Sequence, residues 1–273
     1  IEHLFYPDRG TNEGRRLPDY EYVYNELAKP SKPDAAPLSA KSIKNIHGVL
    51  HKALKQAVLI GYLRTNPTEA CILPRIIRKE MHPLEEDQVA VFLREVQGHP
   101  HEYLYKIALF TGLREGEVLG LGWEHIDFQA GTLTVKRQLR REQKKGGEYY
   151  FSPPKNNKSR CLTLAPSVIQ LFRLQKLEQN SMRMEAGDAW EEHGLIFTNQ
   201  TGGYLSYRTV YDCFKRIVRN IGAPATRFHD LRHTFAVASI KSGDDIKTVQ
   251  ENLGHATAAF TLDVYGHVTK QMK

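Results

Sequence analysis

The stretch "FHDLRHTFAV", residues 228–237, sets two histidines, an arginine and an aspartate in an apolar segment. His229 and His233 stand four residues apart, so a helix would place them on one face. Zinc proteases of the H-E-x-x-H type use this spacing to bind their metal. Here Arg232 lies between the histidines and would repel a dication, and Asp230 is one methylene shorter than the Glu of that motif. We therefore expect no zinc site, and we interpret His233 as a core or supporting residue.

Composition indicates an ordinary globular protein. Of the 273 residues, 41% are hydrophobic and 25% are charged, which is typical of folded domains. No apolar run approaches the roughly 20 residues of a membrane span, and no signal peptide is visible. The cysteines Cys71, Cys161 and Cys213 are far apart and odd in number, so we expect no disulfide framework and a reducing cytoplasm. Because the first residue is Ile, we expect a fragment of a longer protein.

Positive charge is concentrated in one part of the chain. The net charge is +7, and residues 131–160 contain nine Lys or Arg against Glu142 and Glu148. A solvated loop and a phosphate-facing surface both explain such a strip. In the second alternative the strip would contact DNA through Arg137, Arg140, Lys158 and Arg160.

Residues 39–62 predict one long helix. Ser39 is a suitable N-cap, and "TNP" at 65–67 ends the segment. Apolar residues recur at helical spacing, namely Ile43, Ile46, Leu50, Leu54 and Ala57. At about 100° per residue, a basic arc adjoins this stripe and is formed by Lys41, Lys44, His51, Lys52 and Lys55. The arc is either a solvated face or a DNA-binding face, and in the second case we expect contacts from Lys41, Lys44, Lys52 and Lys55.

The remaining pattern predicts two domains that are mainly α with one small antiparallel sheet. We expect a helical domain over 1–75 that is incomplete at its N-terminus, a linker over 76–84 and a second domain over 85–273. Pro-rich segments at 29–37 and 71–87 separate the helices. In the second domain we expect helices over 85–96, 103–112, 114–123, 166–178, 207–221, 230–242 and 245–252. The expected strands are 132–139, 148–153 and 159–165.

Four segments together resemble the tyrosine recombinases, the phage-integrase-like enzymes that cut and rejoin DNA. They are "TGLREGEVLGLGW" (111–123), "FHDLRHTFAV", "LGHATAAFTLDVYGH" (253–267) and, more loosely, "PPKNNKSRCLTL" (153–164). The likeness is greatest to integrases of conjugative transposons and related phages, and it covers the second domain. The helix over 39–62 also resembles the core-binding domain of that family. At the lysine the match is weaker, because the family often has Thr where this chain has Asn156.

The resemblance implies a set of catalytic residues: Arg114, Lys155, His229, Arg232, His255 and Tyr265. The chemistry agrees with that set. Two guanidinium groups can grip phosphate oxygens and stabilise charge in the transition state. A tyrosine has an ordinary pKa of about 10 and needs a proton acceptor to attack, which an imidazole supplies. By resemblance, Lys155 protonates the departing 5′ oxygen, and a 3′-phosphotyrosyl ester stores the bond energy, so neither a metal ion nor ATP is expected as a cofactor.

The resemblance also implies partners and a setting. We expect a site-specific recombinase that integrates or excises a mobile element and binds duplex DNA carrying recombination sites. On DNA it would form a homodimer or homotetramer, with an accessory excision factor as a further partner and no membrane. It would reside in the bacterial cytoplasm, on the nucleoid when bound to DNA. We expect an arm-binding domain before Ile1 and a missing or truncated docking segment after Tyr265.

Two alternatives remain open on the sequence alone. A type IB topoisomerase shares the Arg, Lys and Tyr chemistry and would relax DNA without exchanging strands. A catalytically silent DNA-binding protein would share the fold. The "LGH" block and the small helical domain favour recombination over relaxation, and the intact Tyr265 with both arginines argues against a silent protein.

Overall fold

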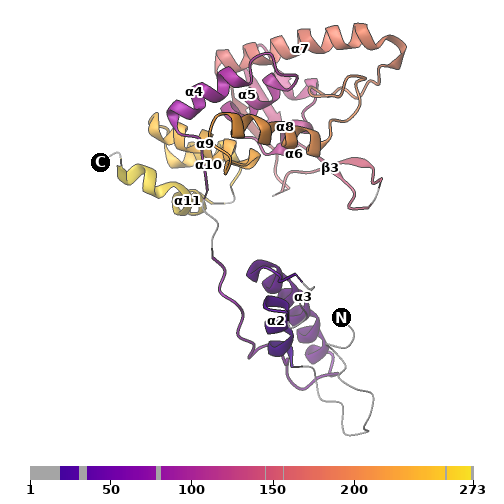
Figure 1. Ribbon diagram of the computed structural model, residues 1–273, viewed down its shortest axis with the longest axis vertical. Helices are drawn as coiled ribbons and strands as arrows, with labels where there is room; N and C mark the ends of the chain where they lie inside the picture. Colours follow the sequence, from indigo (N-terminus) through magenta and orange to yellow (C-terminus); the bar gives the residue numbers. More distant parts are fainter. Residues whose placement is uncertain are drawn as a thin grey trace. The chain divides into compact units, whose positions relative to one another are not determined.

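The computed structural model describes residues 19–30, 36–77, 81–144, 146–155, 157–255 and 257–271 (Figure 1). It divides into two compact units, residues 1–80 and 81–273, and the division falls inside the segment expected as a linker. Parts of the expected domains and of that linker, including 78–80, lie outside the described residues, as does Asn156. Within the described ranges, no helix has both the length and the apolar character needed to cross a bilayer.

The first unit is a pair of helices, α2 (Tyr20–Ala28) and α3 (Ala40–Leu59). The helix expected over 39–62 is confirmed, because the side chain of Ser39 caps α3 by accepting the N–H of Ser42 at 3.1 Å. The shorter α2 was not predicted. Its Tyr20 and Tyr24 pack on Ile43 of α3 to form the buried centre of this unit.

The segment after α3 folds back onto that helix. The side-chain amide of Asn66 donates to the backbone carbonyl of His51 at 3.1 Å. The Thr68 hydroxyl donates to Oδ1 of Asn66 at 2.7 Å. The His51 ring lies 3.0 Å from the Thr68 hydroxyl. His51 is therefore engaged within the unit, whereas Lys41 and Lys52 of the same arc are exposed.

The second unit contains most of the helices. They are α4 (Glu86–Glu95), α5 (Glu102–Thr111), α6 (Glu115–Leu119), α7 (Pro166–Ala186), α8 (Tyr207–Asn220), α9 (Phe228–Lys241), α10 (Ile246–Leu253) and α11 (Ala258–Gln271), with 3₁₀ turns at Trp123–His125 and Gly187–Ala189. The seven expected helices are all found. The α11 helix was not predicted, because the sequence indicated only a short apolar segment there.

Two helices differ in length from the prediction for identifiable reasons. Helix α6 stops before the glycines at 120 and 122, so it is shorter than 114–123. Helix α7 continues to Ala186, well beyond the predicted residue 178. Its inner face there is polar, since the buried Gln179 donates to the carbonyl of Leu195 at 2.8 Å. Apolar periodicity cannot detect such a face.

The expectation of one sheet is wrong, because the strands form two. β1 (Ile126–Asp127), β2 (Thr132–Val135) and β5 (Arg160–Thr163) form an antiparallel sheet in the order β1-β2-β5, and β3 (Gln138–Arg141) pairs with β4 (Tyr149–Ser152) in a hairpin. The strand predicted over 132–139 breaks at 136–137. There Arg137 turns inward and donates to the carbonyl of Gly120 at 2.9 Å, with its guanidinium 4.1 Å from the Phe151 ring centre.

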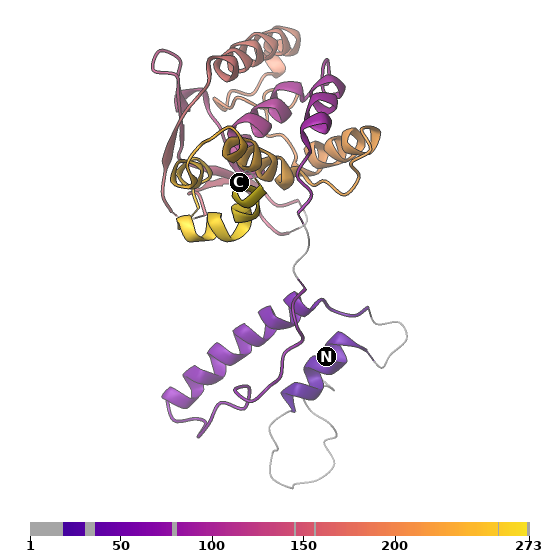
Figure 2. The same cartoon turned by 90° about the vertical axis from the view of Figure 1, so that its left-hand side faces the viewer.

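Helix α9 lies between two hydrophobic clusters. At its N-terminal end Phe228 joins the main core, with its ring centre 5.5 Å from that of Phe214. At the other end Ala236 and Ile240 pack against α10 and α11. In two views α11, drawn in yellow, lies against the orange α9 and α10 (Figures 1 and 2). The polar first half of α9 therefore lies where the ends of α5 and α10 meet.

Candidate active site

Two glycine turns bring the ends of α5 and α10 together. Gly112 and Gly254 both have φ of 62°, in the left-handed region that favours glycine. A Cβ on Gly112 would lie 2.5 Å from Phe235 of α9 and 2.9 Å from Leu253 of α10. Gly112 therefore lets three helices approach closely, and Arg114, two residues further on, is the N-cap of α6.

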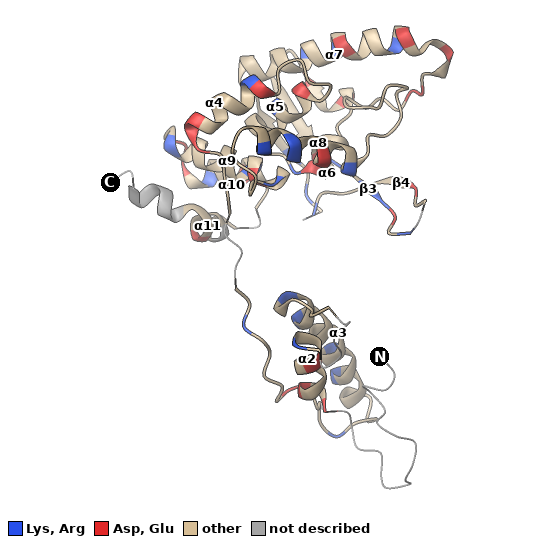
Figure 3. Cartoon of the chain, in the orientation of Figure 1, with Lys and Arg blue, Asp and Glu red and all other residues tan. Residues whose placement is uncertain are grey.

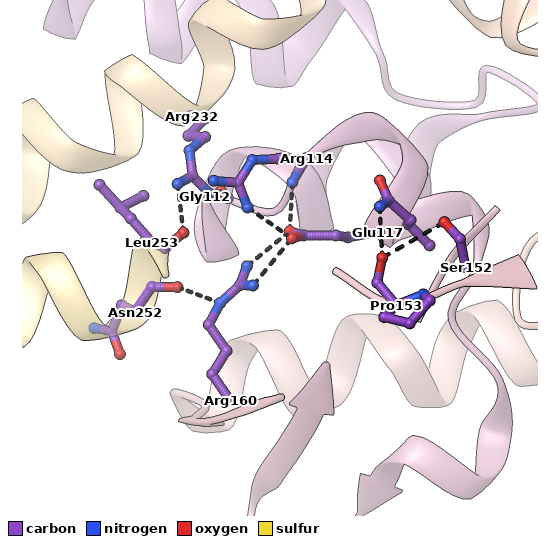
Figure 4. Close-up of polar contacts among 10 residues, drawn as sticks. Gly112, Arg114, Glu117, Ser152, Pro153, Arg160, Arg232, Asn252 and Leu253 are labelled. Atoms are coloured by element: carbon purple, nitrogen blue, oxygen red, sulfur yellow. Dashed lines mark hydrogen bonds and ion pairs between the residues drawn. The ribbon is translucent and has the colours of Figure 1, made fainter. Parts of the chain in front are cut away.

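Arg232 of α9 joins these two turns. Its guanidinium donates to the carbonyl of Gly112 at 2.8 Å and also to the carbonyl of Leu253 (Figure 4). Only 2% of the residue is exposed. Burial, followed by the positive charge of Arg114, lowers the pKa of Arg232 to about 9. An anion bound here would be attracted by two neighbouring guanidinium groups with few competing waters.

Arg114 is held by a buried carboxylate. Glu117, which is 1% exposed, accepts the Arg114 backbone N–H at 2.9 Å and a guanidinium N–H at 2.8 Å. Arg160 of β5 approaches the same carboxylate from the other side, at 2.7 and 3.0 Å (Figure 4). Burial would raise the pKa of Glu117, but the hydrogen bonds and charges of the two arginines lower it to about 2. Glu117 is therefore a carboxylate at every physiological pH, and it orients Arg114.

Two imidazoles of this group are kept neutral. Burial, together with the positive charge of Arg232 and Arg114, lowers the pKa of His255 to about 3. Part of His229 reaches solvent. Desolvation of its ring by neighbouring groups, together with the positive charge of Arg232 and Arg114, still lowers its pKa to about 4. The His255 ring lies 2.9 Å from the hydroxyl of Thr261. Neutral rings can accept a proton, and an anion bound between the arginines would raise their pKa.

Tyr265 lies on α11 with its hydroxyl 2.5 Å from Nδ1 of His233. It is 1% exposed, and burial raises its pKa to about 12 although the positive charge of Arg232 acts in the opposite direction. Nε2 of His233 is 4.0 Å from the fully buried Asp230. Burial would raise the pKa of Asp230, but hydrogen bonds from Arg227 hold it below its usual range. His233 of α9 thus lies between Tyr265 of α11 and Asp230 of α9.

His233, which we interpret from the sequence as a core or supporting residue, contacts the tyrosine hydroxyl in the structure. A signal was present, because His233 shares a helix face with His229 and their rings lie 5.1 Å apart. The sequence did not single out Thr261 or Glu117 as site residues.

Lys155, expected as a catalytic residue, lies in the turn between β4 and β5 and is exposed. Its catalytic role stays a prediction that rests on the resemblance.

Of the residues expected to contact DNA, Arg137 and Arg160 have partners within the protein, and their contacts with DNA stay predictions. Arg137 is bonded to the Gly120 carbonyl and to Glu124 at 3.1 Å. The Arg160 side chain is 10% exposed and directed at Glu117. The other expected contacts are exposed, namely Lys41, Lys44, Lys52 and Lys55 on α3 and Arg140 and Lys158 in the second unit. Basic segments recur along α3 and in the β3–β4 region (Figure 3).

No metal-binding cluster is present within the described ranges, where His, Cys, Asp and Glu do not gather in groups of three or more with suitable geometry. The alternative suggested by the His229–His233 spacing thus has no third ligand among these residues. The pair instead lies beside Arg232 and Tyr265. What the arrangement offers chemically is an anion site with a hydroxyl and neutral proton acceptors next to it.

The chain is similar in sequence to known proteins. A tyrosine recombinase XerC-like protein of Caldanaerobacter subterraneus subsp. tengcongensis is 29% identical over 266 residues, which cover 92% of this chain and 66% of that protein. The ICEBs1 integrase of Bacillus subtilis is 28% identical over 241 residues, covering 85% of this chain and 62% of the relative. The chain thus spans slightly less than two thirds of the length of these curated relatives.

Solved structures share the fold. The Tn1549 transposon integrase in complex with transposon right end DNA superimposes with a TM-score of 0.75 at 24% identity, covering 90% of this chain and 79% of that one. The XerH site-specific recombinase, in a post-cleavage complex, gives a TM-score of 0.63 at 22% identity over 90% of this chain and 65% of that one. Residues 82–272 match the phage integrase family. Since this match covers more than half of the chain, the chain belongs to the phage integrase family.

Proposed function

We propose that this chain is a site-specific DNA recombinase that cuts and rejoins strands to integrate or excise a mobile element. One observation carries the proposal. A tyrosine hydroxyl on α11 lies beside a histidine of α9, and the adjoining residue of α9 is a buried arginine that lies next to Arg114. Membership of the integrase family supports the same reading.

In the proposed reaction the Tyr265 oxygen bonds to the scissile phosphorus while the bond from phosphorus to the 5′ oxygen breaks. Arg114 and Arg232 hold the non-bridging oxygens and stabilise the charge that develops there. A neutral imidazole takes the tyrosine proton, and we propose His229 or His255 for this role once the hydroxyl has left His233. The products are a 3′-phosphotyrosyl ester and a 5′ hydroxyl. Attack on the ester by a 5′ hydroxyl from a second duplex rejoins the strand.

The buried state of Tyr265 adds a step to this reaction. With 1% of the residue exposed, its oxygen cannot reach a phosphate until α11 shifts relative to α9. The shift would break the contact with His233 and bring the hydroxyl towards His229, which is exposed. We propose that His229 and His255 then contact the bound phosphate, and that Lys155 protonates the 5′ oxygen.

The bond energy stays in the phosphotyrosyl ester, so the proposed reaction uses neither a metal ion nor ATP. We propose duplex DNA with recombination sites as the partner, bound by a homodimer or homotetramer. Activity should persist after purification in a chelator. A strict zinc requirement under those conditions would contradict this part of the proposal.

The test uses a nicked duplex taken from the junction between the encoding element and its flanking DNA. A covalent protein–DNA band on a denaturing gel is the expected result, and Tyr265→Phe is the control that should lack it. Strand exchange between two labelled duplexes would then identify a recombinase. Relaxation of supercoiled DNA without exchange would identify a topoisomerase-like enzyme, and binding without any covalent band would identify a silent DNA-binding protein.

A further inference from the structure

Arg160 of β5 is a basic residue whose side chain does not face solvent. It pairs with Val135 of β2 in the sheet, and only 10% of its side chain is exposed. All three guanidinium nitrogens donate within the protein, Nη1 and Nη2 to Glu117 and Nε to the carbonyl of Asn252 at 2.9 Å. Arg160 is therefore held by partners within the protein, the buried carboxylate of Glu117 among them.

The bond from Arg160 to Glu117 affects how strongly Glu117 holds the Arg114 guanidinium. Arg160 gives the carboxylate two nitrogens, whereas Arg114 gives it one guanidinium nitrogen and its backbone N–H. Two cations therefore share one buried anion. Without Arg160, Arg114 would be the carboxylate's nearest cation and would be drawn into a closer, forked pair with it. Its guanidinium would then be less available to a phosphate.

The third bond reaches the turn that carries His255. Asn252 precedes Leu253, whose carbonyl accepts from Arg232. The Arg160 side chain also lies close to Gly254, where an added Cβ would be 3.1 Å from Cδ and from Nη1. Arg160 thus contacts both the residue that orients Arg114 and the turn just before His255 (Figure 4).

We propose that Arg160 is a positioning residue for DNA cleavage, which fixes Arg114 relative to the turn that precedes His255. This inference rests on the proposed function. It assigns Arg160 no contact with DNA, and its effect on the reaction should pass through Arg114. A residue that only stabilised the fold would act in the same way whether or not Arg114 were present.

The experiment compares Arg160→Gln and Arg160→Lys with wild type in the full 273-residue chain. The rate of the covalent band on the nicked duplex is measured in a single turnover, together with affinity for that duplex. Arg160→Gln should slow cleavage by roughly 10- to 100-fold and change affinity by less than about threefold. Arg160→Lys should be intermediate, because it keeps the charge but loses the fork. Arg208→Gln, a matched charge removal at a residue 91% exposed, should match wild type.

The decisive comparison repeats both Arg160 variants in an Arg114→Ala background. If Arg160 acts through Arg114, each further loss of rate should shrink to less than about threefold. An undiminished loss in that background, a wild-type rate in Arg160→Gln, or a fall in affinity larger than the fall in rate would overturn the proposal. Should Arg160→Gln not fold, Arg160→Lys carries the same comparison. Failure of the proposed function is distinguishable, because wild type itself would then form no covalent band.

Discussion

Burial of a guanidinium group costs solvation free energy, and the contacts of Arg232 show how this chain offsets that cost. Two carbonyl oxygens, from Gly112 and Leu253, accept its hydrogen bonds, and the anionic Glu117 lies near enough to oppose the loss of charge. The same contacts fix the orientation of the group. A phosphate would therefore meet a cation that is already desolvated and oriented, which is the condition under which electrostatic stabilisation is strongest.

Replacing either arginine by alanine should lower cleavage by orders of magnitude. Arg114→Ala and Arg232→Ala each remove a donor to developing charge, worth roughly 3 kcal/mol, with a modest loss of affinity. Arg232→Ala should also lower the free energy of unfolding by about 1–3 kcal/mol, because it leaves buried carbonyls unpaired. Single-turnover rates and denaturant unfolding check both parts. A near wild-type rate in either variant would make that arginine purely structural.

Tyr265→Phe should bind its DNA site as tightly as wild type and form no covalent adduct. The substitution removes one oxygen and keeps the packing in the cluster with Ala236 and Leu253. Its stability should fall by only about 1 kcal/mol, for one lost hydrogen bond. Gel shift and a denaturing gel give the two measurements. An undiminished adduct would move the nucleophile to another tyrosine, with Tyr204 and Tyr207 to be examined first.

Glu115 should make stability depend on pH in a way that one substitution removes. Among the described residues, no hydrogen-bond partner reaches its buried Oε1, and burial raises its pKa to about 7. The folded state therefore holds the proton more tightly than the unfolded state. The resulting stability is present below the unfolded pKa of about 4.3 and is lost as the pH rises towards 7.

Glu115→Gln should accordingly stabilise the protein by about 2 kcal/mol at pH 8 and have little effect near pH 4.5. Urea unfolding across this range measures it, with the exposed Glu251→Gln as the matched control. The neutral histidines give the free energy of unfolding the opposite pH dependence. Since the folded pKa of His255 is about 3, its contribution to stability is present above about pH 6.5 and is lost as the pH falls below that. A Glu115→Gln effect that is the same at both pH values would contradict the assignment.

At the scale of elements, apolar periodicity located nearly every helix but could not detect polar burial. The C-terminal end of α7 was placed too early, because Gln175 and Gln179 face inward and bond to carbonyls. The basic strip over 131–160 led us to expect DNA contacts from Arg137 and Arg160. The sequence does not show that Arg160 bonds the buried Glu117, which lies 43 residues before it.

The resemblance singled out Arg114, Arg232 and His255 together, because each lies in a short segment that matches the family. The contact of His233 with Tyr265 joins residues 32 apart, and no local pattern specifies it. Helix α11 was missed for a related reason. Its buried face is completed by α9 and α10, so the sequence of the segment alone shows only a few apolar residues.

Gly112→Ala should destabilise the second unit more than Gly98→Ala, which replaces a glycine with a similar backbone φ. A Cβ at Gly112 would meet Phe235 at 2.5 Å, whereas at Gly98, with φ of 74°, nothing lies within 4 Å. Gly98→Ala therefore reports backbone strain alone, about 1 kcal/mol. Gly112→Ala should cost at least about 2 kcal/mol more because packed rings must shift, and it should lower cleavage through Arg232. Equal free energies of unfolding for Gly112→Ala and Gly98→Ala would show that α9 can shift away from the added methyl group without loss of stability.

For the whole molecule, each unit presents exposed basic residues of its own, Lys44, Lys52 and Lys55 on α3 and Arg140 and Lys158 in the second unit. Both units can thus contribute to holding DNA. Binding through phosphates releases counterions, so affinity should fall steeply with salt. If about eight phosphates are neutralised, the slope of log affinity against log salt should be near roughly −7. The size of the slope alone does not say which unit supplies the contacts.

Replacing Lys44, Lys52 and Lys55 together by alanine separates the two contributions. Each lost phosphate contact should flatten the slope by about 0.9, giving two to three units in all. The matched control removes three exposed basic residues of α7, Arg173, Lys176 and Arg183, and should change the slope by less than about one unit. Affinities measured between 50 and 200 mM salt, roughly the range over which such contacts are lost, give both slopes. An unchanged slope in the α3 variant would mean that this helix faces solvent and that the second unit holds the DNA alone.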